Sequence, residues 1–88
     1  MFEGIISIDN LPTLDLHGEI GDISRVMIYD FIRDNIKLKN KYVVIIHGKG
    51  SLVVKKVTYE VIKNNKDVLE YKLCYYNDGV TILKLNTL

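Results

Sequence analysis

One short motif, His47-Gly48-Lys49-Gly50, has the composition of a phosphate-binding loop. Its two glycines let the backbone approach a ligand closely, and the helix expected after it has an N-terminus that favours anions. The motif is not a Walker A loop, because Val43 stands where that motif has its first glycine and Gly50 where it has Ser or Thr. The sequence therefore predicts phosphate binding, with a turn that only joins a strand to a helix as the alternative.

A second motif, Leu14-Asp15-Leu16-His17-Gly18, contains the other histidine of the chain. Asp15 and His17 are two residues apart, so on a regular strand both side chains point to one face and the carboxylate can orient the imidazole. Such a pair is suited to proton transfer, because an imidazole takes both protonation states near neutral pH. The alternative is that Asp15 caps a turn and His17 is an ordinary surface residue.

Other chemistries have less support. Two histidines and one aspartate could ligate Zn²⁺ or Mn²⁺, but their spacing matches no metal signature, so we favour a site without a permanent metal. No cofactor is certain, and an assisting divalent cation, Mg²⁺ or Mn²⁺, stays open. Cys74 is predicted in the middle of a strand, far from both histidines, which is typical of inert packing rather than of a nucleophile.

The motifs lie on a chain whose hydrophobic pattern predicts the element order strand, helix, strand, helix, strand, strand. The strands are expected at 13–17, 42–46, 68–76 and 80–85, the last two joined through a tight Asp-Gly hairpin turn at residues 77–79. The run 42–46 is apolar throughout, as in strands buried on both faces.

Two amphipathic segments predict the helices. Asp22 is expected to cap the first, in which Ile23, Met27 and Phe31 fall in one row beside a second row of isoleucines. The second helix starts from Ser51, buries the valines at 54, 57 and 61, and ends at Asn64. Because strands joined by helical crossovers run parallel, both histidine motifs should lie at the same carboxyl edge of the sheet, where ligands bind in open α/β folds.

The length and composition fit one small domain. The chain has 88 residues, of which 48% are hydrophobic and 26% charged, so we expect a lead-in over residues 1–12 and a folded domain over residues 13–88. No run approaches the ~20 apolar residues of a membrane span. A lone cysteine excludes an internal disulfide, and together these features predict a cytoplasmic protein with no membrane partner.

The net charge of +1 conceals a gradient along the chain. Residues 1–34 have two Arg against seven acidic residues, a net −5, whereas residues 35–66 have eight Lys against Glu60, a net +7. The basic third surrounds the loop at 47–50, so it could hold a phosphate backbone, although lysines also serve simply to solubilise a surface. Lys55 and Lys56, about one turn into the second helix, are the preferred phosphate contacts because their location does not depend on the conformation of the loop.

Tyrosine is frequent for this length, with six residues, and exposed rings could stack on unpaired bases. Tyr42 and Tyr71 are predicted in the core. Tyr75 and Tyr76 fall on opposite faces of the expected strand, so one of the two can point outward.

Taken together with the element order, the two motifs and the closing segment Gly79-Val80-Thr81-Ile82-Leu83-Lys84-Leu85 resemble the Smr (small MutS-related) domain family over residues 13–85. The resemblance implies a two-layer α/β sandwich with βαβαββ order, a mixed four-stranded sheet and two helices, similar to the C-terminal domain of bacterial translation initiation factor three. It also implies nucleic-acid binding and, in many members, an endonuclease that nicks DNA or cleaves RNA.

The resemblance carries over to individual positions. Asp15 and His17 match the Leu-Asp-x-His motif of the family, and His47, Gly48 and Gly50 match its His-Gly-x-Gly motif. Two segments depart from the family pattern. A short Asn-Asp-Gly stretch at 77–79 stands where the family has a glycine-rich loop, and Ser-Leu-Val at 51–53 replaces the usual glycine or threonine-glycine.

Three hypotheses follow. In the first, the domain is an endonuclease in which His47 and His17 transfer protons at the scissile phosphate and Asp15 orients an imidazole or binds an assisting cation. Lys49 then stabilises the developing charge. The phosphates of DNA or RNA are held by Gly48, Lys49, Gly50, Lys55 and Lys56. The second hypothesis is a non-catalytic nucleic-acid or ribosome-binding module, and the third is a protein-interaction domain.

Overall fold

Four strands and two helices follow one another in the predicted order. The structure is a computed structural model that describes residues 10–50 and 52–88. The elements are β1 (Thr13–Asp15), α1 (Gly21–Lys37), β2 (Tyr42–Ile46), α2 (Leu52–Asn64), β3 (Val68–Leu73) and β4 (Val80–Leu85). The predicted lead-in falls largely on residues 1–9, which lie outside the described residues.

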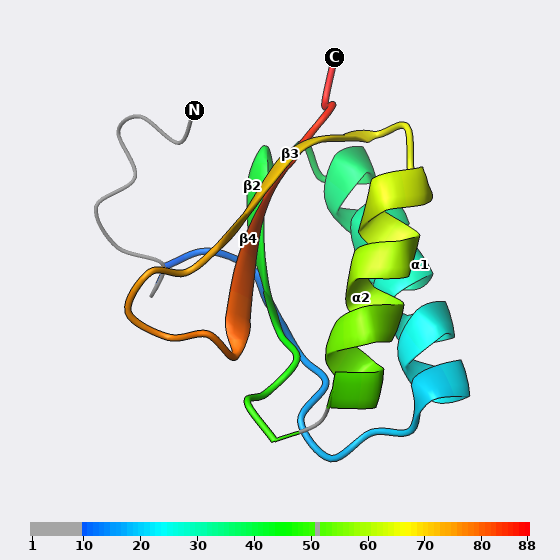
Figure 1. Ribbon diagram of the computed structural model, residues 1–88. Helices are drawn as coiled ribbons and strands as arrows, with labels where there is room; N and C mark the ends of the chain where they lie inside the picture. The colour runs from blue at the N-terminus through cyan, green and yellow to red at the C-terminus, as the bar shows by residue number, and fades with distance from the viewer. Residues whose placement is uncertain (1–9, 51) are drawn as a thin grey trace.

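The sheet is mixed, with the strand order β1-β2-β4-β3. β1 runs parallel to β2, and β4 runs antiparallel to both of its neighbours. Figure 1 shows α1 and α2 on the same face of this sheet, which confirms the two-layer α/β architecture. Each helix leaves the carboxyl end of a strand and returns the chain to the opposite end, so both helix N-termini lie at the carboxyl edge of β1 and β2.

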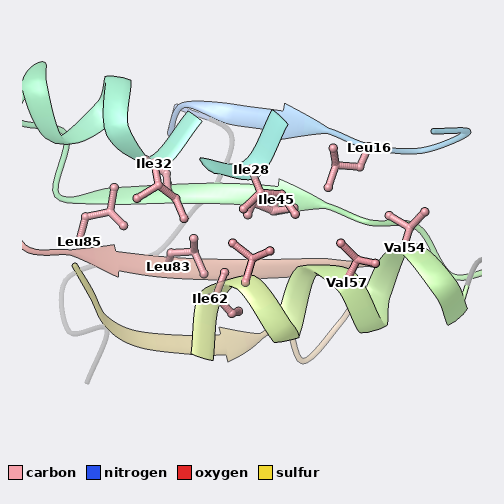
Figure 2. Packing of buried hydrophobic residues seen from close by; sticks show 11 residues of the cluster. Leu16, Ile28, Ile32, Ile45, Val54, Val57, Ile62, Leu83 and Leu85 are labelled. Atoms are coloured by element: carbon pink, nitrogen blue, oxygen red, sulfur yellow. The ribbon is translucent and has the colours of Figure 1, made fainter. Parts of the chain in front are cut away.

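The core fills the space between the helices and the sheet (Figure 2). Strand alternation turns Val43 and Ile45 of β2, with Leu83 of β4, toward the helices, where Ile28 of α1 and Val61 of α2 pack on them. The intervening residues of both strands belong to a second buried cluster on the other face of the sheet. β2 is therefore buried on both faces, as its apolar sequence predicts. Within residues 10–50 and 52–88, neither helix is long and apolar enough to cross a bilayer.

Helix α1 differs from the prediction at its start and in the face that it buries. It begins at Gly21, its N-cap is the apolar Ile20, and Asp22 therefore lies in the first turn instead of capping the helix. Its carboxylate still lies at the positive end of the helix dipole. Ile23 is 47% exposed, and the row with Ile28 and Ile32 faces the sheet. Two neighbouring apolar rows run along this helix, and only its packing decides which of them is buried.

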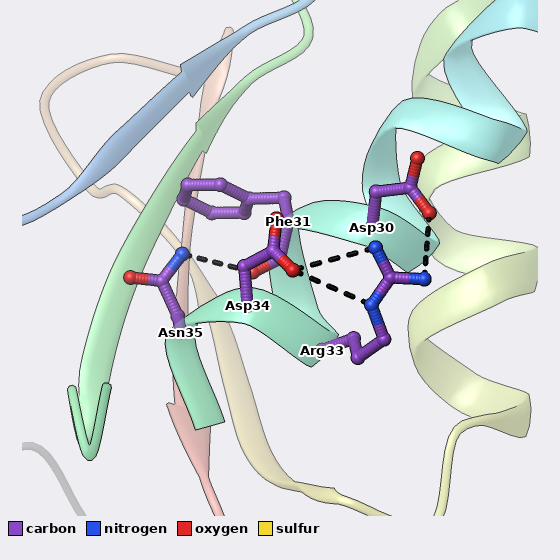
Figure 3. A network of polar contacts seen from close by, with 5 residues as sticks. All are labelled: Asp30, Phe31, Arg33, Asp34 and Asn35. Carbon is purple, nitrogen blue, oxygen red and sulfur yellow. Dashed lines mark hydrogen bonds and ion pairs between the residues drawn. The ribbon is translucent and has the colours of Figure 1, made fainter. Parts of the chain in front are cut away.

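Polar contacts hold the C-terminal half of α1, as Figure 3 shows. The side chain of Asn35, which is buried, donates a hydrogen bond of 2.8 Å to the carbonyl of Phe31. Arg33 lies between two acidic side chains, Asp30 at 3.3 Å and Asp34 at 3.3 Å. These ion pairs are exposed and contribute little, so the satisfied buried asparagine matters more for the end of this helix.

Strand β3 is shorter than predicted, and its connection to β4 is a six-residue turn, 74–79, in place of a tight hairpin. The ladder with β4 stops at the pair Leu73 and Thr81, so Tyr75 and Tyr76 lie outside the sheet. Cys74 lies just after the strand and is buried as a free thiol. Its N–H donates to the carbonyl of Val80, which ties the start of this turn to the start of β4.

Candidate functional site

The structure brings the two histidine motifs to one edge of the sheet. In the parallel pair of β1 and β2, Asp15 is in register with Ile46, and the Leu16 N–H donates to the Ile46 carbonyl at 2.7 Å. The turn at 15–18 and the loop at 47–50 therefore leave neighbouring strands at the same end. The N-termini of α1 and α2 lie at this carboxyl edge as well, and their dipoles favour anions there.

Asp15 and His17 form a capped turn and not a pair on one strand face. β1 ends at Asp15, whose Oδ1 accepts a hydrogen bond of 2.9 Å from the backbone N–H of His17. Gly18 completes the turn with a φ of 84°, in the left-handed region that favours glycine. The expectation that both side chains share a strand face is thus wrong, because the strand stops two residues too early. The carboxylate fixes the backbone of His17 and leaves its imidazole exposed at the edge.

His47 points into the protein. Its side chain is 1% exposed, and its Nε2 lies 2.8 Å from Oγ1 of Thr81, which in turn lies 2.9 Å from the hydroxyl of Tyr59. Its Nδ1 lies 3.2 Å from the carbonyl oxygen of Gly48. The imidazole thus joins the loop, β4 and α2 through a chain of polar contacts.

These contacts fix the proton positions along the chain of hydrogen bonds. A carbonyl oxygen can only accept, so we assign the ring proton of His47 to Nδ1. Nε2 then accepts from the hydroxyl of Thr81, and Thr81 accepts from Tyr59. Burial lowers the pKa of His47 below its ordinary 6.5, and the positive charge of Lys55 also lowers it. The hydrogen bond with the Gly48 carbonyl and the charge of Asp78 raise this pKa, but burial has the largest effect. The neutral imidazole is therefore the stable form, as this arrangement of donors requires.

Gly79 supports the 47–50 loop from the neighbouring turn. Its carbonyl accepts hydrogen bonds of 3.0 Å from the N–H groups of both His47 and Gly48. A Cβ at Gly79 would lie 3.0 Å from the carbonyl carbon of Gly48 and 3.1 Å from the backbone nitrogen of Lys49. The absence of a side chain at Gly79 lets these two backbones approach closely without displacement, so the short Asn-Asp-Gly segment still contributes to the site.

The sequence analysis missed Thr81, Tyr59 and the supporting role of Gly79. The sequence did offer a signal for Thr81, which is the one polar residue in the apolar run between Gly79 and Lys84. The alternation along β2 also placed His47 on the same side as Val43 and Ile45, which is the side that the helices cover.

Three lysines lie at the site. Lys49 is exposed, with its Nζ 3.9 Å from Oδ1 of Asp78. Lys55, half-buried on α2, is close enough to His47 to affect its pKa, and Lys56 beside it is exposed. These side chains supply positive charge next to the loop.

The other lysines of the basic third lie at the far end of the domain, which corrects the expectation that this third surrounds the loop. They lie in the last turn of a helix or in the segment just after it, where cations balance the helix dipole: Lys37, Lys39, Lys41, Lys63 and Lys66. Lys41 and His47 flank the two ends of β2 and are six positions, or about 20 Å, apart. The positive charge at the site is therefore local and modest.

The described residues do not form a resident metal site. Across residues 10–50 and 52–88, no three His, Cys, Asp or Glu side chains come together in a way that could hold an ion. Asp15 contributes a single carboxylate, and one of its oxygens accepts the hydrogen bond from His17.

Comparison with known proteins identifies the family. Residues 14–86 match the model of the Smr domain. The chain belongs to the Smr domain family. It is 33% identical over 79 residues to the endonuclease MutS2 of Halothermothrix orenii and 32% identical over 79 residues to that of Caldanaerobacter subterraneus. These alignments cover 86% of the chain but 10% of each relative, so this Smr domain spans about a tenth of their length.

Two solved structures share the fold of this Smr domain. The Smr domain of Thermus thermophilus MutS2 superimposes with a TM-score of 0.82 at 19% identity, over 85% of this chain and 98% of that one. YdaL, a stand-alone small MutS-related protein from Escherichia coli, gives 0.78 at 23% identity, over 83% of this chain and 63% of its own. The two-layer architecture is thus the Smr fold.

Proposed function

We propose that this Smr domain binds nucleic acid at the carboxyl edge of β1 and β2 and cleaves a phosphodiester bond there. The observation that carries the proposal is the meeting of the exposed imidazole of His17, the 47–50 loop and two helix N-termini at that edge. The relatives named endonuclease MutS2 support cleavage as the reaction.

In this proposal the residues have distinct roles. The side chains of Lys49, Lys55 and Lys56 hold the phosphates, with Gly48 and Gly50 shaping the backbone between them. They do so beside the positive N-terminus of α2.

Proton transfer falls to His17. Its neutral ring takes a proton from the attacking water, or its charged ring gives one to the oxygen that leaves as the P–O bond breaks. Asp15 positions His17 through the turn. His47, first expected to transfer protons itself, becomes a positioning residue because both of its ring nitrogens are bonded inside the protein.

A cleavage assay with labelled single-stranded and structured RNA and DNA, with and without chelator, tests the proposal. We expect His17→Ala to reduce cleavage at least about 100-fold, the usual contribution of a general acid or base, without changing stability because the side chain is exposed. The chelator arm tests whether a divalent cation assists. Unchanged cleavage by His17→Ala would refute the role of this residue.

Binding is tested separately by titration at several salt concentrations. The double variant Lys55→Ala and Lys56→Ala should weaken binding and flatten its salt dependence, since each lost phosphate contact lowers the slope by about one unit. The matched control is Lys63→Ala with Lys66→Ala, which removes the same charge from the far end of α2. Equal losses in both double variants would contradict a local phosphate site.

A non-catalytic binding module is the second candidate, and the burial of His47 favours it because one exposed imidazole then remains at the edge. It predicts salt-dependent binding with intact substrate after long incubation. A ribosome as the partner and the cytoplasm as the compartment stay predictions.

A further inference from the structure

The turn between β3 and β4 presents two aromatic rings to solvent. Tyr75 is 89% exposed and Tyr76 is 61% exposed. Their ring centroids lie 5.0 Å apart with an interplanar angle of 87°, an edge-to-face pair. Most of the surface of both residues is nonetheless exposed to solvent.

The turn that carries this pair is held by hydrogen bonds on both sides of it. Cys74, immediately before it, is buried and hydrogen bonded to β4, and Asn77 after it closes the turn in two ways. The N–H of Asn77 donates to the Cys74 carbonyl at 3.3 Å, and its side-chain oxygen accepts from Gly79 at 3.0 Å. These hydrogen bonds hold the backbone that carries the two rings, which lowers the entropy lost when a ligand binds to the turn.

The same turn touches the proposed phosphate site. Asp78 approaches the Lys49 ammonium, and the Gly79 carbonyl binds two N–H groups of the 47–50 loop. Gly79 is three positions after Tyr76, so their Cα atoms are at most about 11 Å apart. A strand advances about 3.4 Å per nucleotide, so a segment of a few nucleotides can reach from a phosphate held at the loop to the rings.

We propose that Tyr75 and Tyr76 form a stacking platform for unpaired bases, which makes single-stranded nucleic acid, or an unpaired segment of a folded one, the substrate class of this domain. The proposal rests on the proposed nucleic-acid function. Bases within a duplex have their faces covered by neighbours and cannot stack on a protein ring, whereas unpaired bases can. The platform would favour single-stranded over double-stranded nucleic acid, while the lysines hold the phosphates of the bound strand.

The test measures binding of the full chain to a labelled oligouridylate, the matching oligothymidylate and a blunt duplex of the same length. Tyr75→Ala and Tyr76→Ala should each weaken single-strand binding by roughly five-fold or more and leave duplex binding unchanged. Tyr75→Phe and Tyr76→Phe should keep the affinity, because the ring remains. Tyr29→Ala is the matched control, since Tyr29 is exposed on α1 away from this turn.

The outcomes separate the two proposals. If the alanine variants lose affinity for the RNA strand, the DNA strand or both, the platform is supported, and the strand affected shows which sugar the site accepts. The platform is refuted if the alanine variants keep their affinity, or lose the same affinity for single strand and duplex. If Lys55→Ala with Lys56→Ala still weakens binding in that case, the phosphate site stands. If the wild-type chain binds no nucleic acid even at low salt, both proposals are overturned and the rings serve another partner.

Discussion

Replacing Thr81 by valine removes the middle of the buried chain of hydrogen bonds and nothing else. Valine has nearly the same shape as threonine, so the substitution exchanges one hydroxyl for a methyl group at a site that is 0% exposed. Two contacts are lost, the 2.8 Å bond with Nε2 of His47 and the 2.9 Å bond with Tyr59. The His47 acceptor stays buried without a donor, while the half-buried Tyr59 can turn its hydroxyl toward water.

The expected cost follows from that asymmetry. An unsatisfied buried acceptor costs about 1–3 kcal/mol, and the loss at Tyr59 adds little because water replaces the partner. We therefore expect Thr81→Val to lower the free energy of unfolding by about 1–3 kcal/mol. For a domain of this size each kcal/mol corresponds to a fall in Tm of about 4–8 °C.

Urea unfolding followed by circular dichroism measures this change, with an unchanged m-value showing that the folded state stays compact. Thr58→Val is the matched control, because Thr58 is also 0% exposed but its hydroxyl donates only to the carbonyl of Val54. That carbonyl also takes part in the helix, so no buried group loses its only partner and we expect a smaller change than for Thr81→Val. If Thr81→Val were as stable as wild type, or if both substitutions cost the same, the assigned hydrogen-bond chain would be refuted.

Two further predictions concern the same loop. Gly79→Ala should destabilise the domain by about 1–3 kcal/mol, because the added Cβ would press on the backbone of Gly48. Gly50→Ala is the control and should leave Tm unchanged, because a Cβ at Gly50 has nothing within 4 Å. Equal Tm values for the two variants would contradict the prediction. Because the pKa of His47 is lowered in the folded state, the unfolded chain binds a proton at this residue more readily, and the free energy of unfolding should fall as the pH decreases below 6.5. A His47→Asn variant should lack this part of the pH dependence. Parallel curves of stability against pH for the two proteins would refute the prediction.

Local patterns predicted the elements well because their causes are local. The uninterrupted apolar run of β2 and the valine spacing of α2 each report how one segment buries its own side chains, and both were confirmed. The end of α2 at Asn64 was confirmed for the same reason. α1 shows the limit, since two adjacent apolar rows satisfy the same periodicity and the packing against the sheet chose the one with Ile28.

The tyrosines show a similar limit in the strands. Tyr71 was expected in the core but is 37% exposed, because β3 is an edge strand and lacks a neighbour on one side. Tyr75 and Tyr76 were expected on opposite faces of a strand. They lie in a turn, because the register with β4 ends the ladder at Leu73.

By itself, the sequence determined the order of the elements, the parallel pairing that brings both motifs to one edge, and the membership of the Smr family. The tertiary structure decided what each side chain does there. It turned His47 inward onto Thr81, left His17 exposed on a capped turn, and placed five lysines at the opposite end. The physical reason is that periodicity and motif depend on neighbours along the chain, whereas burial, hydrogen-bond partners and clusters of charge depend on segments that meet only when the sheet and helices pack.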